Sequence, residues 1–451
     1  MQGVYNRPLY SIGMPEPAPT PAPAPQLIRA IGRWSLAALT VNSIIGSGIF
    51  GLPSLIAGLV GRASPWAYLV AAAGMGVIMA CFAEVASRFT GAGGPYLYAR
   101  VAFGRFIGIQ MGWLSWLVRV AAGAANANLF TIYLAEFWPG AKAPLPRLLV
   151  LTALIGMITS VNYRGVKQGT QVSNIFTAGK LIPLAALIIA GFAYLAMGHP
   201  AVVQPEFNAS AGSWLQATLL LVFAYGGFEG ALMPLGEARD PRRDAPFALF
   251  TALATCTLIY TLIQIVVMAV LVNPQATDRP LATTAHLILG PAGGALIALG
   301  ALISVYGYLA AHMINAPRLT FALAEHGDIP PVFAAIHHRF RTPHVSIIMF
   351  GAAVWALAFW GNFTWNVILS AASRLFTFAV VCAAVIQLRK TQPQRAAFRL
   401  PAGIVFATLG VIFSLVLITR MGRREFLILA ITALISFLNW LWARTRVPTP
   451  K

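Results

Sequence analysis

The sequence predicts an all-α integral membrane protein, and three observations carry that prediction. Hydrophobic residues make up 58% of the 451 residues and charged residues only 10%, whereas soluble domains carry about 25% charged residues. Apolar runs of about 20 residues, the length that crosses a bilayer as a helix, recur along the chain. The short alternating segments of a membrane β-barrel are not seen, so a bundle of helices is expected.

Twelve membrane-spanning helices are expected, because twelve apolar runs are separated by polar or charged loops. The expected spans are 34–60, 66–87, 107–136, 146–162, 171–197, 213–236, 246–273, 292–317, 345–360, 364–388, 401–419 and 425–443.

The basic residues predict the orientation of these spans. With the N-terminus in the cytoplasm, 21 of the 31 Lys and Arg residues fall in cytoplasmic loops and tails and 7 fall on the opposite side. Because Lys and Arg are retained on the cytoplasmic side, we expect both termini in the cytoplasm and the protein in the cell (inner) membrane. Arg420, Arg423 and Arg424 run against this trend, just before the last span.

The remaining composition excludes several classes of protein. Residues 1–30 include the proline-rich run PEPAPTPAPAPQ and are expected to form a disordered cytoplasmic tail. The net charge of +19 is scattered in ones to threes, without the clustered basic face of a nucleic-acid-binding protein. Cys81, Cys256 and Cys382 lie in apolar runs without metal-ligand spacing. We therefore expect no nucleic-acid partner, no metal and no cofactor.

Glycines interrupt two of the apolar spans, the first and the sixth. They are Gly46, Gly48 and Gly51 in NSIIGSGIFGLPS (42–54), and Gly226, Gly227 and Gly230 in FAYGGFEGALMPLGE (223–237). Each glycine weakens a helix by about 1 kcal/mol relative to alanine. An odd number of spans per repeat inverts the second copy relative to the first. Two broken spans in corresponding positions are therefore typical of an inverted-repeat transporter, whose binding site lies at the breaks.

Such breaks suit a zwitterionic ligand. Where the first helix resumes, its unpaired N–H groups favour a carboxylate, and Ser47 adds a hydroxyl. Where the preceding half-helix stops, free carbonyl groups favour an ammonium group. An α-amino acid carries both charges on one carbon. The alternative is that the glycines only allow close helix packing, as small residues often do in membranes.

Five stretches of the chain resemble the amino acid–polyamine–organocation superfamily of transporters. They are IIGSGIFGLP, AEVASRFTGAGGPYLYARVAFG, VNYRGVKQGTQVSNIFTAGKLIPL, FAYGGFEGALMPLGEARDPRRDAP and RLTFALAEHGDIPPVFAAIHHRFRTP. The resemblance covers roughly residues 30–445. It implies a leucine-transporter-type fold with a first repeat at 31–200, an inverted second repeat at 210–390, and two peripheral helices at 400–445. Helices 1 and 6 would be discontinuous.

The resemblance also implies a substrate site. Ser47 and Gly48 would bind the substrate carboxylate, and the carbonyl groups of Ile44, Phe223 and Gly226 would bind its amine. The Phe223 ring would take the position of an aromatic gate. Members that exchange arginine for agmatine have Trp at that position and Ile where this chain has Gly226.

Two charged residues inside expected spans are assigned to coupling. Glu229 matches a glutamate regarded as pH-sensitive in members that exchange arginine for agmatine. Lys180 lies near the middle of the fifth span, where a charge costs at least about 2.5–3.5 kcal/mol. Some sodium-independent members have a fifth-helix lysine whose ammonium stands in place of sodium. The resemblance thus implies sodium independence, with proton coupling or exchange. The alternative is a lysine that snorkels to the interface or pairs structurally.

We therefore expect a secondary active amino acid transporter, not an enzyme, with a neutral zwitterionic substrate and possible proton coupling. A cationic amino acid or polyamine antiporter and a non-transporting membrane sensor remain alternatives. An enzyme would need a motif such as HExxH, and the close pair His337 and His338 lies in an expected loop. A channel would need a selectivity filter, and no such segment is seen. The roles of five further residues stay open, as does the oligomeric state. These residues are Arg119, Asn126, Asn128, His312 and Arg374.

Overall fold

The computed structural model describes residues 31–89, 94–165, 170–204, 208–232, 235, 237–393 and 396–445. Within 170–204, side chains are described only from residue 179 onward. The expected N-terminal tail, residues 1–30, lies outside them. The described residues fold into helices joined by short connections. An isolated β-bridge between Ile31 and Ala238 is their one strand-like pairing, so the all-α prediction is confirmed.

The helices follow one another with short 3₁₀ turns between some of them. The first half contains α1 (Arg33–Ile44), α2 (Ser47–Val60), α3 (Ser64–Ala86), α4 (Gly94–Phe103), α5 (Arg105–Leu134), α6 (Pro144–Tyr163) and α7 (Thr170–Ala196). The second half contains α8 (Ala211–Tyr225), α9 (Phe228–Ala231), α10 (Pro241–Val270), α11 (Pro280–Glu325), α12 (His344–Trp360), α13 (Phe363–Thr391), α14 (Gly403–Ile418) and α15 (Arg423–Arg444).

Each expected span coincides with a helix or a pair of helices, with two differences. The ten-residue helix α4 is not among the expected spans. Helix α11 begins at Pro280, before the expected start at 292, and is kinked at Gly290, where φ is 74°. In the described part of the chain, nine helical segments are long and apolar enough to cross a membrane, and α12 and α14 are shorter apolar helices.

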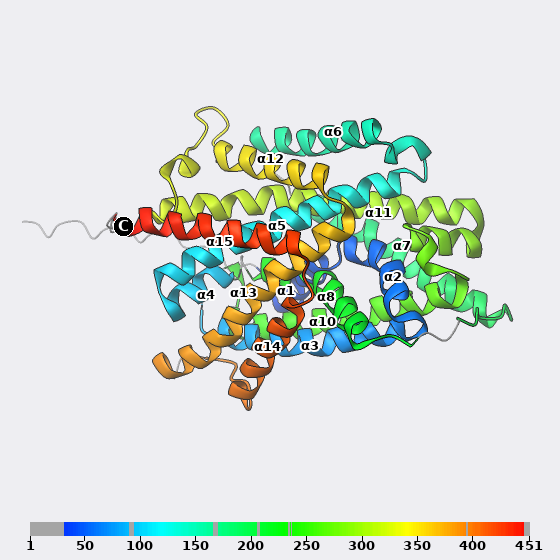
Figure 1. Cartoon of the computed structure of the whole chain (residues 1–451), viewed down its shortest axis with the longest axis horizontal. Helices are drawn as coiled ribbons and strands as arrows, with labels where there is room; N and C mark the ends of the chain where they lie inside the picture. The colour runs from blue at the N-terminus through cyan, green and yellow to red at the C-terminus, as the bar shows by residue number, and fades with distance from the viewer. Residues whose placement is uncertain are drawn as a thin grey trace, which may run out of the picture.

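The helices divide into an inner group and an outer group. In α5, 83% of the most apolar window is buried inside the protein, against 22% in α6 and 17% in α15. Figure 1 shows α6 and α12 along the upper edge, α3 and α14 along the lower edge, and α1, α8 and α10 between them. Helix α1 packs on α10, and α2 packs on α8. The broken helices therefore lie inside the bundle.

Large apolar side chains remain exposed on the outer helices. Examples are Ile404 and Val405 of α14 and Phe426 and Leu427 of α15, each more than half exposed. Apolar surface of this extent is not left in water and marks contact with a membrane or a partner. Together with the long apolar helices, it makes the chain a multi-pass membrane protein.

Two buried carboxylates tie the ends of helices together on the side expected to face the cytoplasm. Glu84 of α3 accepts a hydrogen bond from Arg389 of α13, at 2.6 Å. Asp328, just after α11, accepts from Arg100 of α4 at 2.5 Å and from Arg105 of α5 at 2.7 Å. These ion pairs join segments that are far apart in sequence. Glu84 and Asp328 therefore stabilise one end of the bundle and not its centre.

Candidate substrate site at two helix breaks

The first break separates α1 from α2 by two residues. Helix α1 ends at Ile44, Ile45 is extended, and Gly46 adopts a non-helical conformation with φ −126° and ψ −143°. Ser47 and Gly48 are then the first two residues of α2. The N–H groups of a first helical turn have no acceptor within the helix, and they carry the positive end of its dipole.

The second break separates α8 from α9. Helix α8 ends at Tyr225, and Gly227 has φ +110°, a conformation that suits glycine alone. A Cβ atom at Gly227 would lie 2.3 Å from the Ser43 carbonyl oxygen of α1. The two breaks therefore touch through backbone.

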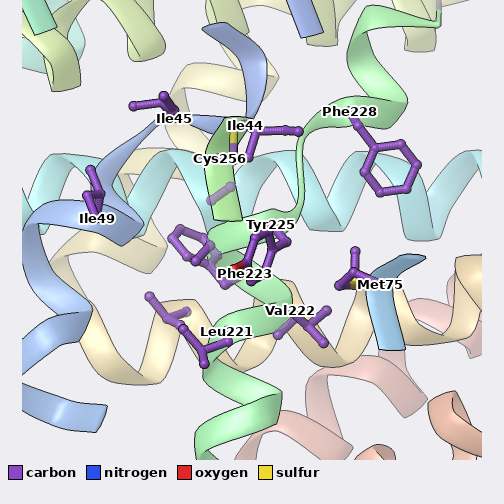
Figure 2. Close-up of a cluster of buried hydrophobic side chains, with 14 of the residues drawn as sticks. Ile44, Ile45, Ile49, Met75, Leu221, Val222, Phe223, Tyr225, Phe228 and Cys256 are labelled. Carbon is purple, nitrogen blue, oxygen red and sulfur yellow. The ribbon is translucent and has the colours of Figure 1, made fainter. Parts of the chain in front are cut away.

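Further contacts hold the two breaks together. A Cβ atom at Gly48 would lie 2.9 Å from Cα of Ala224, so α2 and α8 approach closely. The Tyr260 hydroxyl lies within hydrogen-bond distance of the carbonyl oxygens of Ile44, at 3.3 Å, and Ala224, at 3.1 Å. Figure 2 shows Ile44 beside the connection between Tyr225 and Phe228. The packing role of the glycines is thus real, and it accompanies the cavity described next.

A small cavity lies between the breaks. It is lined by Ile44, Gly46, Ser47 and Gly48 from the first break, by Phe223 and Gly226 from the second, and by Asn126 of α5, Tyr308 of α11 and Arg374 of α13. The structure thus brings all five residues expected to bind substrate to one cavity. Their role in binding stays a prediction.

Three buried polar atoms of this lining have no hydrogen-bond partner among the described residues. They are Ser47 Oγ, Asn126 Oδ1 and Arg374 Nη1. An unsatisfied buried polar group costs about 1–3 kcal/mol, and native structures contain few of them. Two of the three carbonyl groups expected to bind the amine already accept a hydrogen bond. The Ile44 carbonyl group accepts from the Tyr260 hydroxyl, and the Phe223 carbonyl group accepts from the Gly226 N–H. A carbonyl oxygen has a second lone pair for an amine.

Lys180 of α7 lies against the first break and not at an interface. Its ammonium donates to the carbonyl oxygens of Asn42, at 2.6 Å, and Ile45, at 2.7 Å. The side chain is buried, with 5% of the residue exposed, so the snorkelling alternative is wrong. Lys180 thus binds carbonyl groups at the C-terminal end of α1, whereas the cavity lies beside Ile44 and Gly46.

Glu229 of α9 is held by an ion pair that the sequence did not reveal. One carboxylate oxygen accepts from Nε of Arg374 at 2.7 Å, and the other accepts from the Gly227 N–H at 2.9 Å. The Arg374 guanidinium also lies 5.8 Å from the centre of the Phe223 ring, within range of a cation–π contact. Glu229 is not among the residues that line the cavity, whereas its ion-pair partner Arg374 is.

The other open candidates lie around this pair. Arg119 is buried in α5 and interacts electrostatically with Glu229 and Arg374. His312 stacks on Tyr308 with ring centres 3.9 Å apart and is not among the residues that line the cavity. Asn128 accepts a hydrogen bond from Arg147 at 2.7 Å and is not among the residues that line the cavity.

A helical membrane protein with two broken helices in contact around a small polar cavity is a membrane transporter. Within that class, the family model for amino acid permeases matches residues 31–437, so the chain belongs to the amino acid permease family. This confirms the resemblance found in the motifs. The family consists of membrane transporters, which are not enzymes.

Three relatives illustrate the range of the family. The methylthioribose transporter of Bacillus subtilis is 27% identical over 83% of this chain and 84% of its own. The arginine/agmatine antiporter of Chlamydia pneumoniae is 28% identical over 90% of this chain and 88% of its own. The branched-chain amino acid permease of Bacillus subtilis is 26% identical over 92% and 91%.

Proposed function

We propose that this transporter moves amino acids by alternating access, with the substrate bound between the two helix breaks, and that it does so without sodium. The substrate carboxylate meets Ser47 and Gly48 at the start of α2. The substrate amine meets the carbonyl groups of Ile44, Phe223 and Gly226. The family match and the permease and antiporter among the relatives support an amino acid substrate.

The contact between Lys180 and the first break carries the sodium-independence proposal. In transporters with broken helices, carbonyl groups at the end of a half-helix coordinate the coupling cation. Here two such groups, from Asn42 and Ile45, bind the Lys180 ammonium. A tethered cation at this point supplies the charge that a sodium ion would otherwise bring.

Glu229 is the second residue that we propose for coupling, in addition to Lys180. Its carboxylate is bound to Arg374, so a substrate that draws the guanidinium away changes the surroundings of the carboxylate and with them its readiness to take up a proton. Proton coupling and substrate exchange are both compatible with this arrangement.

The proposal includes the membrane topology. Twelve spans would form two inverted repeats of five, at 31–200 and 210–390, and a peripheral pair at 400–445. Both termini would face the cytoplasm, and the protein would lie in the cell (inner) membrane. The low burial of α15 supports a peripheral position for the last pair.

Uptake into proteoliposomes tests the proposed function. Purified protein is reconstituted and offered a panel of labelled amino acids, with sodium or with choline outside. We expect uptake of at least one amino acid at the same rate in both media. A collapse of uptake in choline contradicts sodium independence, and the absence of uptake for the whole panel contradicts amino acid transport. Separate arms with a pH gradient and with internal substrate distinguish proton coupling from exchange.

The Ser47 hydroxyl offers a direct test of the carboxylate position. We expect Ser47→Ala to weaken substrate binding roughly 10- to 100-fold, because a hydrogen bond to a charged group contributes about 1.5–3 kcal/mol. Binding is measured by calorimetry on purified protein. Ser54→Ala is the matched control, since Ser54 is also buried in α2 without a partner among the described residues but does not line the cavity. Wild-type affinity in Ser47→Ala would place the carboxylate elsewhere.

A further inference from the structure

We propose that the substrate is an amino acid whose side chain carries a carboxylate, and that Arg374 is the residue that binds this second carboxylate. The inference rests on the proposed function, because it takes the cavity between the breaks as the substrate site. It differs from the neutral substrate expected from the sequence. The reason is an intramembrane arginine whose position only the fold reveals.

The guanidinium of Arg374 is positioned to bind a ligand. Its Nε is engaged by Glu229 at 2.7 Å, while its Nη1 is buried and, among the residues described, has no hydrogen-bond partner. Arg374 as a whole is 2% exposed. A guanidinium offers five N–H donors in a planar fork, which binds carboxylates better than any other side chain does. Glu229 thus fixes Nε, and the Tyr308 hydroxyl also interacts with the guanidinium, while Nη1 remains without a partner.

Gly226 makes room for this guanidinium. A Cβ atom at residue 226 would lie 2.4 Å from Nη1 of Arg374 and 2.6 Å from its Cζ. The guanidinium therefore occupies the space that a side chain at 226 would fill. The guanidinium lies beside the carbonyl group of Gly226, which is proposed to bind the substrate amine. A short substrate side chain would therefore reach it.

The unpartnered atoms of the cavity match the charges of an acidic amino acid. Within the described structure, the lining presents two unused donors, Ser47 Oγ and Arg374 Nη1, and one unused acceptor, Asn126 Oδ1. Two donors suit two carboxylates, and the acceptor joins the carbonyl groups that suit one ammonium. A neutral amino acid would leave the arginine donor unsatisfied.

The charge around the cavity favours the same substrate. In the part of the chain that is described, Arg119 and Arg374 face one carboxylate there, that of Glu229, and the three interact electrostatically. Buried charge is costly unless it is compensated. An anionic substrate supplies the compensation, whereas a cationic one adds to the excess and finds Glu229 already bound to Arg374 and Gly227.

Comparison of acids with their amides tests the inference in the wild-type protein. Proteoliposomes are offered labelled L-glutamate and L-aspartate beside L-glutamine, L-asparagine, L-leucine and L-arginine. Acid and amide have nearly the same shape, so the ratio of their uptake reports the charge. We expect at least one acid to exceed its amide by about tenfold or more, since a site built for a polar group rejects an analogue that cannot pair with it.

Variants then assign the selectivity to Arg374. The double variant Glu229→Gln/Arg374→Gln removes both members of the ion pair together, so that neither is left without the other. In substrate binding to the purified variant, we expect the preference for acid over amide to fall to within about twofold; Arg374→Lys, which keeps the positive charge, should retain part of the preference. Arg243→Gln, at an exposed arginine of α10, is the control and should keep the full preference.

The outcomes separate this inference from the proposed function. Uptake of neutral or cationic amino acids in preference to both acids overturns the inference and leaves the transport proposal standing. No uptake of any amino acid by folded protein contradicts the proposed function itself. An unchanged acid preference in the double variant removes Arg374 as its cause. If the double variant does not fold, the wild-type acid-to-amide ratio and Arg374→Lys still decide the question.

Discussion

Lys180→Ala is expected to lower net amino acid uptake by about 10- to 100-fold while the protein still inserts and purifies. The ammonium donates to two carbonyl oxygens, of Asn42 and Ile45, at 2.6 and 2.7 Å. Each hydrogen bond of this charged kind contributes about 1.5–3 kcal/mol, and every 1.4 kcal/mol is a factor of about ten in an equilibrium. Without the ammonium, these carbonyl groups are left in a dry interior.

The expected loss has a conformational origin. A contact changes the balance between two facing states when it is stronger in one state than in the other. Lys180 joins α7 to the break between α1 and α2, and relative motion of these helices would strengthen or weaken its two hydrogen bonds. Removal of the lysine should therefore favour one state and slow the cycle.

The Lys180 experiment compares the variant with the wild type in sodium and in choline. Lys142→Ala is the control, because Lys142 forms a half-exposed ion pair with Asp278 at 2.5 Å, away from the breaks. Full uptake by Lys180→Ala would remove the lysine as the cause of sodium independence. Equal wild-type rates in the two media combined with a strong loss in the variant would support its role.

The sequence was sufficient to locate the breaks because glycines in an apolar span conflict with a requirement of membrane helices. A membrane helix needs its backbone hydrogen bonds, and glycine destabilises the helix that forms them through its greater backbone freedom. Gly46 and Gly226 therefore stand out without any structure, and the structure ends α1 just before Gly46 and α8 just before Gly226. Lys180 stands out for the same kind of reason. Its partners in the structure are the carbonyl groups of Asn42 and Ile45.

Arg374 could not be assigned from the sequence because its partner lies 145 residues away. An intramembrane Arg and an intramembrane Glu should pair with something, but only the fold brings α13 beside the break before α9. The position of Arg374 is also the reason that we propose an acidic substrate, where the sequence alone favours a neutral one. Helix α4 was missed for a local reason, since ten residues with Arg100 near the end fill no 20-residue apolar window. The early start of α11 was missed because glycines and a proline around Gly290 masked its continuity.

Gly227→Ala is expected to reduce transport by at least about tenfold and to lower the melting temperature of the purified protein. Two costs add at this residue. Its φ of +110° lies where non-glycine residues lose about 1–2 kcal/mol or more. A Cβ atom there would also lie 2.3 Å from the backbone oxygen of Ser43, which cannot rotate away as a side chain can. Helix α9 would have to move off α1, and the Gly227 N–H that holds Glu229 would move with it.

Gly230→Ala is the matched control for this prediction, three residues further along the same short helix. No described atom lies within 4 Å of a Cβ atom at Gly230, and alanine favours a helix over glycine by about 1 kcal/mol. We expect Gly230→Ala to transport at the wild-type rate with an equal or higher melting temperature. Equal losses in the two variants would mean that any added methyl group disturbs α9. Wild-type behaviour of Gly227→Ala would show that α1 and α9 do not meet through the backbone, because a methyl group has no room in that contact.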